Sequence, residues 1–516
     1  MKPISKFFFT LLVLTGCYNE SSQSDKPFLQ NVMKHYKLPS FNLMDKQEEE
    51  KFIYPLMVVK RANALNLDVA HFMDMSRWKS IQEEAQKNIA TFDYPKVNFE
   101  GATSRELNEF LKTANKKTVV LTRDIEATEA VIVPPQTIID GGGFTVRAST
   151  PRIFLLHDIN HAAVRNINTG GDFETAVYVT NGDNILLEKL HISKGKDRPV
   201  VVMGKTTHLY LLNNTIEENG KGGIYIRGDV SQGLIEGNKI RNNGHSSNLS
   251  AGLVITDIKI VDLHDTEKVA FEKIDHRMTY PHDLVIMNNE IMEQKSSGIY
   301  LDGPVSIYIT KNRLVRNDKE GICLDNGTTG CHFFNNEVIE NGGRRKQTDD
   351  DLKGDFVLQF GRLEDGSSKA KLPGVSIDNA VYNVIIDNII KGNYGSGVKM
   401  VRTGIRTIIG KNKIVNNNAG TNDRFHFFGV ELGLAVLDFE TDILDAAPAY
   451  ENIIFSNQIE GPHYAGIFLA EEAYHNTAFK NEITGVKEFG IESISSKNNY
   501  ARENNMDKPS RGPLTE

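Results

Sequence analysis

Residues 289–325, NEIMEQKSSGIYLDGPVSIYITKNRLVRNDKEGICLD, contain the same pattern twice. Asn289 recurs 23 residues later as Asn312, and Gly298 recurs after the same interval as Gly321. Each asparagine starts an Asn-x-apolar triplet, and each glycine starts the sequence Gly-Ile-x-Leu-Asp. Two independent marks that recur together at one interval indicate a repeat architecture.

Both marks extend along most of the chain. The asparagine mark returns every 23 or 24 residues, except where insertions lengthen the interval to 45, 51 or 52 residues. Weaker repeats precede it around Phe154, Val177 and Val200. The asparagines are Asn214, Asn238, Asn289, Asn312, Asn336, Asn388, Asn412, Asn457 and Asn481, and the glycines are Gly223, Gly252, Gly298, Gly321, Gly374, Gly397, Gly429 and Gly466.

A unit of this length accommodates three short strands and three turns. Successive units then stack as parallel coils at about 4.8 Å, with Ile, Leu and Val inside. The asparagine belongs at a turn, where it tolerates left-handed φ and its amide can bond the backbone and the next asparagine. The sequence therefore predicts an all-β fold, a β-solenoid.

The repeat resembles the pectate-lyase-like right-handed parallel β-helix superfamily over residues 100–500. This resemblance implies right-handed coiling. It also implies a relationship to polysaccharide lyases, glycoside hydrolases and C5-epimerases. The repeat is specific for the fold and does not select among these reactions.

The N-terminus has the features of a targeting segment. Lys2 and Lys6 precede the apolar run 7–14, which is too short to span a bilayer. Leu14-Thr15-Gly16-Cys17 resembles the lipobox of bacterial lipoproteins, which implies a signal peptide over 1–16 and lipidation of Cys17. It also implies anchoring at the outer membrane or cell surface, on the periplasmic or extracellular side, through lipid alone. An ordinary signal peptide is the alternative.

The remaining chain divides by composition. Residues 17–44 are expected to be a tether, and the helical pattern of 45–99 is expected to cap the exposed apolar end of the solenoid. Ser104 to Ala114 predicts a further helix with Ser104 as its N-cap. Residues 100–500 form the β-helix, and 501–516 are a polar tail.

Charged residues are concentrated at the outward-facing positions of the repeat. In Gly-Ile-x-Leu-x the two x positions point away from the core and stack into two columns. The first column reads Tyr225, Val254, Tyr300, Cys323, Ser376, Lys399, Glu431, Phe468, and the second reads Arg227, Thr256, Asp302, Asp325, Asp378, Val401, Gly433, Ala470. Three aspartates of the second column therefore fall on successive coils.

Asp302, Asp325 and Asp378 are the leading catalytic candidates. Adjacent carboxylates in such a column lie about 5 Å apart and alternate ones about 10 Å apart. Like charges at this spacing favour one protonated acid beside one carboxylate, as in glycosidases. The alternative is a Ca²⁺ ion among the three, and no other cofactor is indicated. Aspartate also favours strand-ending turns without any catalytic role.

The insertions support a functional surface. They fall at about 258–281, 341–373, 418–428 and 433–451, all beside the same outward face, and predict a walled groove. A strand hidden within 341–373 is an alternative that would move Asp378 one coil away from Asp325.

The same outward face contains further candidates for residues that line the groove. Lyases of the superfamily use Lys or Arg to abstract the proton α to a uronate carboxyl, often with Ca²⁺, which implies Lys399 or Arg402 as base. Acidic neighbours such as Glu431, itself a candidate, favour charged Lys399 and count against that role. Substrate-binding candidates are Arg227 for acidic groups, Tyr225 and Tyr300 for sugar rings, and His426 for the groove wall.

Tyr280-Pro281-His282-Asp283 resembles the Asp-Pro-His-Asp motif of mannuronan C5-epimerases, whose histidine is the base. The resemblance adds His282 to the substrate-binding candidates and epimerisation to the hypotheses. Tyr280 departs from the motif, and Asp302-Gly303 stand where that family has its catalytic arginine.

Composition narrows the partners. The formal net charge is −8 and basic tracts are absent, which argues against a nucleic acid partner. The expected partner is a polysaccharide or oligosaccharide. A non-catalytic β-helix that binds carbohydrate or protein, or helps deliver a periplasmic cofactor, is the alternative class. Cys323 and Cys331 are expected either to form a disulfide or to remain two thiols.

Overall fold

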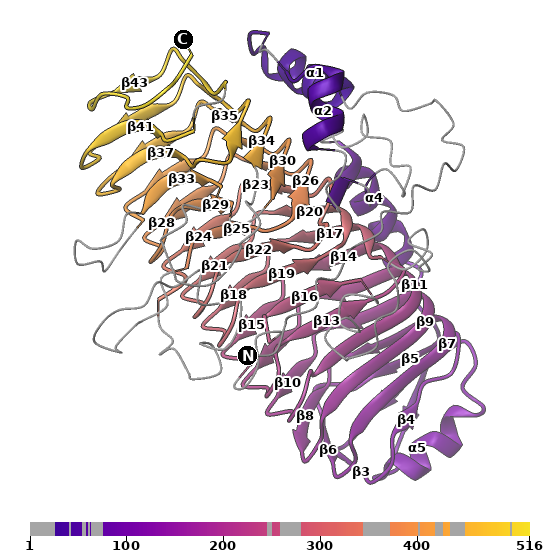
Figure 1. The fold of residues 1–516 in the computed structure, drawn as a ribbon. Coiled ribbons are helices and arrows are strands. Elements are labelled where there is room, and N and C mark those ends of the chain that lie inside the picture. Colours follow the sequence, from indigo (N-terminus) through magenta and orange to yellow (C-terminus); the bar gives the residue numbers. More distant parts are fainter. Residues whose placement is uncertain are drawn as a thin grey trace, which may run out of the picture.

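The chain folds into an elongated parallel β-solenoid with helices along one side (Figure 1). The computed structural model describes residues 26–40, 43–53, 58–59, 62, 76–244, 250–257, 280–343, 372–400, 403–417, 427–433, 449–495 and 498–515. Among these residues, no helix is long and apolar enough to cross a membrane. Cys17 and the predicted signal segment lie outside the described residues.

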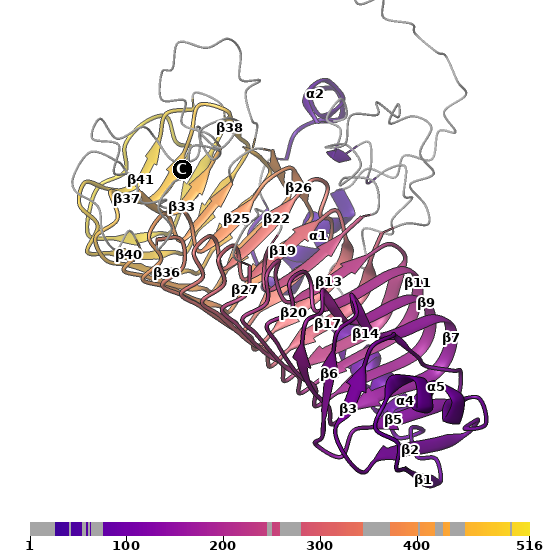
Figure 2. The same ribbon diagram turned by 90° about the horizontal axis from the view of Figure 1, so that it is seen from below.

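Each coil contributes one strand to each of three faces, and the strands pair in parallel along the long axis (Figure 2). The first face consists of β4 (Val131–Ile132), the leading parts of β7 (Arg152–Arg165), β9 (Thr175–Glu188) and β11 (Val200–Leu212), then β13 (Ile224–Arg227), β16 (Leu253–Thr256), β19 (Ile299–Asp302), β22 (Ile322–Asp325), β25 (Val375–Ile377), β29 (Val398–Met400), β33 (Phe428–Leu432), β37 (Ala465–Leu469) and β41 (Phe489–Ser493).

The second face continues from the long strands β7, β9 and β11, which bend from one face into the next. Its other strands are β1 (Lys96–Phe99), β2 (Lys117–Leu121), β5 (Thr137–Asp140), β14 (Val230–Glu236), β17 (His282–Met287), β20 (Val305–Thr310), β23 (His332–Phe334), β27 (Val384–Ile386), β31 (Ile408–Gly410), β35 (Ile453–Phe455), β39 (Thr477–Phe479) and β42 (Tyr500–Arg502).

The third face is a separate sheet with 14 strands among the described residues. These are β3 (Ile125–Ala127), β6 (Thr145–Ala148), β8 (Asn168–Gly171), β10 (His191–Ser193), β12 (Thr215–Glu217), β15 (Lys239–Arg241), β18 (Glu290–Met292), β21 (Arg313–Val315), β24 (Glu337–Ile339), β28 (Ile389–Lys391), β32 (Lys413–Val415), β36 (Gln458–Glu460), β40 (Glu482–Thr484) and β43 (Asn505–Met506). A small sheet joins the later coils: β26 (Ala380–Val381), β30 (Gly404–Ile405), β34 (Ala449–Tyr450) and β38 (Ala473–Tyr474).

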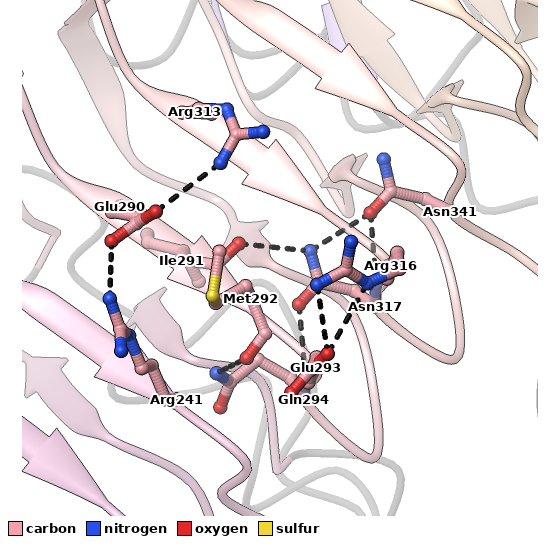
Figure 3. Close-up of polar contacts among 10 residues, drawn as sticks. All are labelled: Arg241, Glu290, Ile291, Met292, Glu293, Gln294, Arg313, Arg316, Asn317 and Asn341. Atoms are coloured by element: carbon pink, nitrogen blue, oxygen red, sulfur yellow. Dashed lines mark hydrogen bonds and ion pairs between the residues drawn. The ribbon is translucent and has the colours of Figure 1, made fainter.

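The asparagine mark forms the predicted hydrogen-bonded ladder. The side chain of Asn312 donates to Asn336 at 3.0 Å and accepts from Asn289 at 2.9 Å, and the same contacts recur along the fold. A second ladder lies five residues farther along each coil and passes through Gln294, which bonds Asn317 (Figure 3). Stacked side-chain amides therefore satisfy the buried turns between coils.

We expect Asn312→Leu to lower the free energy of unfolding by about 3 kcal/mol, measured by urea denaturation. The change removes the acceptor of the Asn289 backbone N–H and the donor to the Ile286 carbonyl, and a buried unsatisfied group costs about 1–3 kcal/mol. Asn98→Leu, at an exposed strand position, is the matched control and should change stability little. Equal effects of the two substitutions would refute the ladder's stabilising role.

The N-terminal helices do not cap the solenoid end as predicted. Helix α4 (Arg77–Ile89) packs Trp78, Ile81 and Ala85 against the second face, where it contacts β11, β14 and β17. Helix α1 (Lys26–Tyr36) lies inside the predicted tether and buries Phe28 and Leu29 on the later coils of that face. Helix α2 (Lys46–Phe52) follows α1 along the chain, and its Glu49 contacts Arg406 of the later coils. An amphipathic pattern predicts that a helix has a buried face without specifying the surface that covers it.

Two boundaries at the ends also differ from the prediction. The N-terminal end of the solenoid is covered by α5 (Ser104–Leu111), whose Leu107 and Leu111 belong to the solenoid core. Its N-cap is Thr103, because the extended backbone there lets the hydroxyl accept from the Glu106 N–H in a capping box. The predicted polar tail continues the fold, since β42 and β43 pair with the preceding coil.

His463 gives the fold a predicted acid sensitivity. Its side chain is fully buried before β37, and neither ring nitrogen has a hydrogen-bond partner among the described residues. Burial lowers the pKa of His463 to about 4. The unfolded chain binds this proton near pH 6.5. Stability present above pH 6.5 is therefore lost as the pH falls towards 4, by roughly 3 kcal/mol.

His463→Leu should flatten the pH dependence of urea stability between pH 6.5 and 4. The control His157→Leu changes an exposed histidine and should leave that dependence unchanged. A slope that is the same in the His463 variant and the wild type would assign the acid sensitivity to other groups.

Candidate functional site

On the first face, the first outward column and the described part of the second have the predicted register, and Val401 lies outside the described residues. Tyr225 pairs with Val254, then Tyr300 and Cys323 follow on successive strands. Farther along, Lys399 pairs with Glu431. Strand β22 pairs directly with β25, so Asp378 lies one coil beyond Asp325 and no additional strand separates them. The predicted aspartate column is therefore continuous.

Asp325 lies in a network of hydrogen-bond donors. Its Oδ2 accepts from the Tyr300 hydroxyl at 2.7 Å, and its Oδ1 accepts from the Asn326 backbone N–H at 2.8 Å. Burial, followed by the charges of Asp325 and Asp302, raises the pKa of Tyr300 well above its usual range. Tyr300 therefore remains a proton donor, and both contacts suit an ionised Asp325 carboxylate.

Asp302 has a different environment, one coil away. It is 2% exposed, whereas Asp325 is partly exposed. Its Oδ1 accepts from the Asn326 side-chain amide at 3.0 Å, and its Oδ2 lies 3.2 Å from the Thr256 hydroxyl. The same hydroxyl also lies 3.1 Å from the Asp257 carbonyl oxygen. Asp302 is therefore a buried acceptor of two side-chain hydrogen bonds.

Asn326 links the two carboxyl groups, a role that the sequence analysis missed. It occupies the left-handed turn after β22 with φ 43°, a conformation that asparagine tolerates. Its backbone contacts Asp325 and its side chain contacts Asp302. The sequence analysis treated strand-ending turns only as the non-catalytic explanation for the aspartates, and the turn at Asn326 is the one that orients the pair.

Lys399 and Glu431 form an ion pair on the later strands. Nζ of Lys399 lies 2.7 Å from Oε1 of Glu431, and the Ser396 hydroxyl donates to Oε2 at 2.7 Å. Glu431 is 3% exposed and the Lys399 side chain 19%. Because its ammonium group is held by a buried carboxylate, Lys399 is poorly suited to abstract a proton.

Tyr225 and Arg227 lie on the same face, two coils before Tyr300 and Asp302. Burial raises the pKa of Tyr225, and the charges of Arg227 and Arg198 partly offset this rise. The Arg198 guanidinium stacks on the Tyr225 ring at 4.3 Å.

The structure does not bring His282 into this column. His282 begins β17 on the second face, where its Nδ1 lies 3.0 Å from Asp283, and Asp283 pairs with Arg77 of α4 at 2.7 Å. His282 also lies 3.5 Å from Asp229. Arg402 and His426 fall outside the described residues, so their predicted roles stay predictions.

Cys323 and Cys331 are both free and buried, so the predicted disulfide alternative is wrong in this structure. Cys323 points outward in the first column, whereas Cys331 packs in the solenoid core. Burial, followed by the charges of Glu320, Asp325 and Asp378, raises the pKa of the Cys323 thiol well above its usual range. The thiol is consequently protonated and a weak nucleophile.

The described residues contain no group of three or more His, Cys, Asp or Glu side chains placed to hold a metal ion. The calcium hypothesis for Asp302, Asp325 and Asp378 stays a prediction.

Comparison with protein families identifies the architecture. The model described as the right-handed β-helix region matches residues 153–267, and the one described as the periplasmic copper-binding protein NosD matches residues 285–424. This chain is a right-handed parallel β-helix. Each of these two family models matches less than half of this chain. No curated protein matches its sequence.

Solved structures with the same fold have diverse functions. The A-module of Azotobacter vinelandii mannuronan C-5 epimerase AlgE4 aligns with a TM-score of 0.47 at 12% identity, over 81% of this chain and 97% of that one. The catalytic domain of GH87 alpha-1,3-glucanase aligns with 0.42 at 11%, over 82% and 68%. The Streptococcus pneumoniae surface protein and adhesin PfbA aligns with 0.40 at 10%, over 78% and 95%. At these identities the likeness concerns the fold alone.

Proposed function

We propose that this protein cleaves glycosidic bonds of a polysaccharide lying along the first face, with Asp325 and Asp302 as its two catalytic carboxyl groups. The observation that supports this most is their contrasting hydrogen bonding through the shared Asn326. Asp325 is partly exposed and accepts from the Tyr300 hydroxyl and the Asn326 backbone, whereas Asp302 is buried and accepts from the Asn326 side chain and the Thr256 hydroxyl. Burial beside a second carboxylate favours the protonated form of Asp302. Two neighbouring carboxyl groups in opposite protonation states are what glycoside hydrolysis requires.

In this proposal, Asp302 protonates the leaving glycosidic oxygen and Asp325 attacks the anomeric carbon or activates water. Their strands are adjacent, about 4.8 Å apart, which is near the separation of about 5–5.5 Å found in retaining enzymes. Tyr300 positions Asp325 and offers its ring face to a sugar. The Lys399–Glu431 pair places a fixed positive charge farther along the same face.

A lyase is the competing reaction on the same face. It would need a base for the proton α to a uronate carboxyl, and the paired state of Lys399 argues against that residue. The hydrolase proposal is therefore preferred, and epimerisation through His282 is disfavoured by its position on the second face.

Product release from a panel of uronate-containing and neutral polysaccharides tests this proposal. Reducing ends without ultraviolet absorbance are expected from hydrolysis. Ultraviolet absorbance of an unsaturated product would show that the protein cleaves by elimination and not by hydrolysis. No reducing ends and no absorbance from any polymer would reject glycosidic-bond cleavage.

A second candidate function is assistance in copper delivery outside the cytoplasm. The observation favouring it is the match of residues 285–424, which include β19 and β22, to the family described as the periplasmic copper-binding protein NosD. Direct titration of the protein with Cu(I) and Cu(II) tests it, and absence of stoichiometric binding would reject it. Both candidates place the chain outside the cytoplasm, as the predicted lipid anchor at Cys17 also does.

A further inference from the structure

The early coils of the first face repeat one arrangement of arginine on tyrosine. The Arg152 guanidinium lies 4.1 Å from the ring centre of Tyr178, and the Arg198 guanidinium lies 4.3 Å from that of Tyr225. Tyr178 pairs with Val201, which pairs with Tyr225, so the two tyrosines are two coils apart. The two arginine–tyrosine units therefore recur at about 10 Å along the solenoid axis.

These two arginines differ from two arginines of the third face. On the third face, Arg241 and Arg313 both pair with Glu290, at 2.7 and 3.3 Å (Figure 3). Among the described residues, neither Arg152 nor Arg198 forms an ion pair. Arg152 is exposed and Arg198 is partly exposed. The Nε of Arg198 is buried and has no hydrogen-bond partner in the part of the chain that the structure describes.

Two nearby aspartates pair with lysines. Asp197 pairs with Lys221 at 3.2 Å, and Asp172 pairs with Lys196. Stacking on a tyrosine fixes the plane of each guanidinium and leaves its N–H edge able to bond an anionic group. The local surface thus offers two oriented cations at a regular spacing.

The tyrosine column leads directly to the proposed catalytic pair. Tyr225 pairs with Val254, which pairs with Tyr300, so the third tyrosine follows at the same two-coil interval. Tyr300 has no arginine stacked on it among the described residues and bonds Asp325 instead. A linear ligand held at the first two units would extend along the axis to the Asp302–Asp325 pair.

We propose that Arg152, Tyr178, Arg198 and Tyr225 form a binding strip for a linear anionic polysaccharide that runs parallel to the solenoid axis. The arginines bind acidic groups recurring at about 10 Å, or at half that interval, and so select charged over neutral polymers. This inference deepens the proposed function and rests on it for the direction in which the ligand reaches Asp325.

Titration calorimetry with polygalacturonate, with its carboxyl-reduced neutral form and with dextran sulfate tests the strip. Arg152→Gln and Arg198→Gln are each expected to weaken polyanion binding about tenfold, since a hydrogen bond to a charged group contributes about 1.5–3 kcal/mol. The control Arg147→Gln removes the same charge from the third face and should change affinity little. The neutral polymer should bind weakly to every variant.

If the double variant Arg152→Gln/Arg198→Gln bound polyanions with wild-type affinity, the proposed binding strip would be refuted. Equal binding of charged and neutral polymers, or no binding of either polyanion at millimolar repeat units, would overturn it too. Preference for dextran sulfate over polygalacturonate would retain the strip and assign it to sulfate groups. Arginine-dependent binding without product release would retain the strip while rejecting the proposed function, whereas product release with arginine-independent binding would do the reverse.

Discussion

Asp325→Asn is expected to lower kcat for polysaccharide cleavage by about two to four orders of magnitude, which is the contribution of a general acid or base. The amide keeps the shape of the carboxyl group and can still accept a hydrogen bond from Tyr300, so folding should be preserved. The loss arises because an amide cannot attack the anomeric carbon or activate water. Initial rates of reducing-end release, with thermal unfolding measured alongside, give the result.

Two further variants separate chemistry from positioning. Tyr300→Phe removes only the donor to Asp325 and should cost about one order of magnitude. Glu337→Gln changes an exposed carboxylate on the third face and should leave the rate unaltered. An Asp325→Asn variant with wild-type activity would show that the aspartate column is a turn feature, as the non-catalytic alternative requires.

Arg406→Met is expected to lower the free energy of unfolding by about 3–5 kcal/mol, the largest stability effect that we predict. Arg406 is 1% exposed at a turn of the later coils, and its guanidinium contacts Glu49 of α2, Glu451 and the Tyr382 hydroxyl. Removing it leaves two buried carboxylates without their cation. Urea denaturation measures the loss.

Because Glu49 belongs to α2, the same variant should also loosen the N-terminal helices from the second face. Limited proteolysis should then release residues 26–53 before the β-helix is cut. The triple variant Glu49→Gln/Arg406→Met/Glu451→Gln removes the buried charges together and should recover most of the stability. Arg313→Met breaks only exposed ion pairs and should cost under about 1 kcal/mol. An equally small loss in Arg406→Met would contradict a structural role for this cluster.

The repeat made the β-helix predictable, because the asparagine and glycine marks report the same coil from two different turns. Since parallel strands pair in register, the intervals alone placed Tyr225, Tyr300 and Cys323 in one column and Lys399 beside Glu431. The predicted position of Asp378 in this column was less certain, because a long insertion precedes it. The direct pairing of β22 with β25 removed that ambiguity.

Features that depend on contacts between distant segments were not predictable. The charge of Glu49 gives no sign that it lies against Arg406, 357 residues away. The helical pattern before residue 90 did not indicate a lateral surface, and α1 was mistaken for part of a tether. The second amide ladder had a usable signal, since Asn317 and Asn341 follow Asn312 and Asn336 at a constant offset of five residues.

The most direct test of a catalytic first face is a crystal structure of the Asp325→Asn variant with an oligosaccharide from the polymer that the wild type cleaves. We predict a sugar chain parallel to the solenoid axis, with a ring against Tyr300 and a glycosidic oxygen within hydrogen-bond distance of Asp302. An oligosaccharide bound only on the second or third face, at saturating concentration, would contradict it.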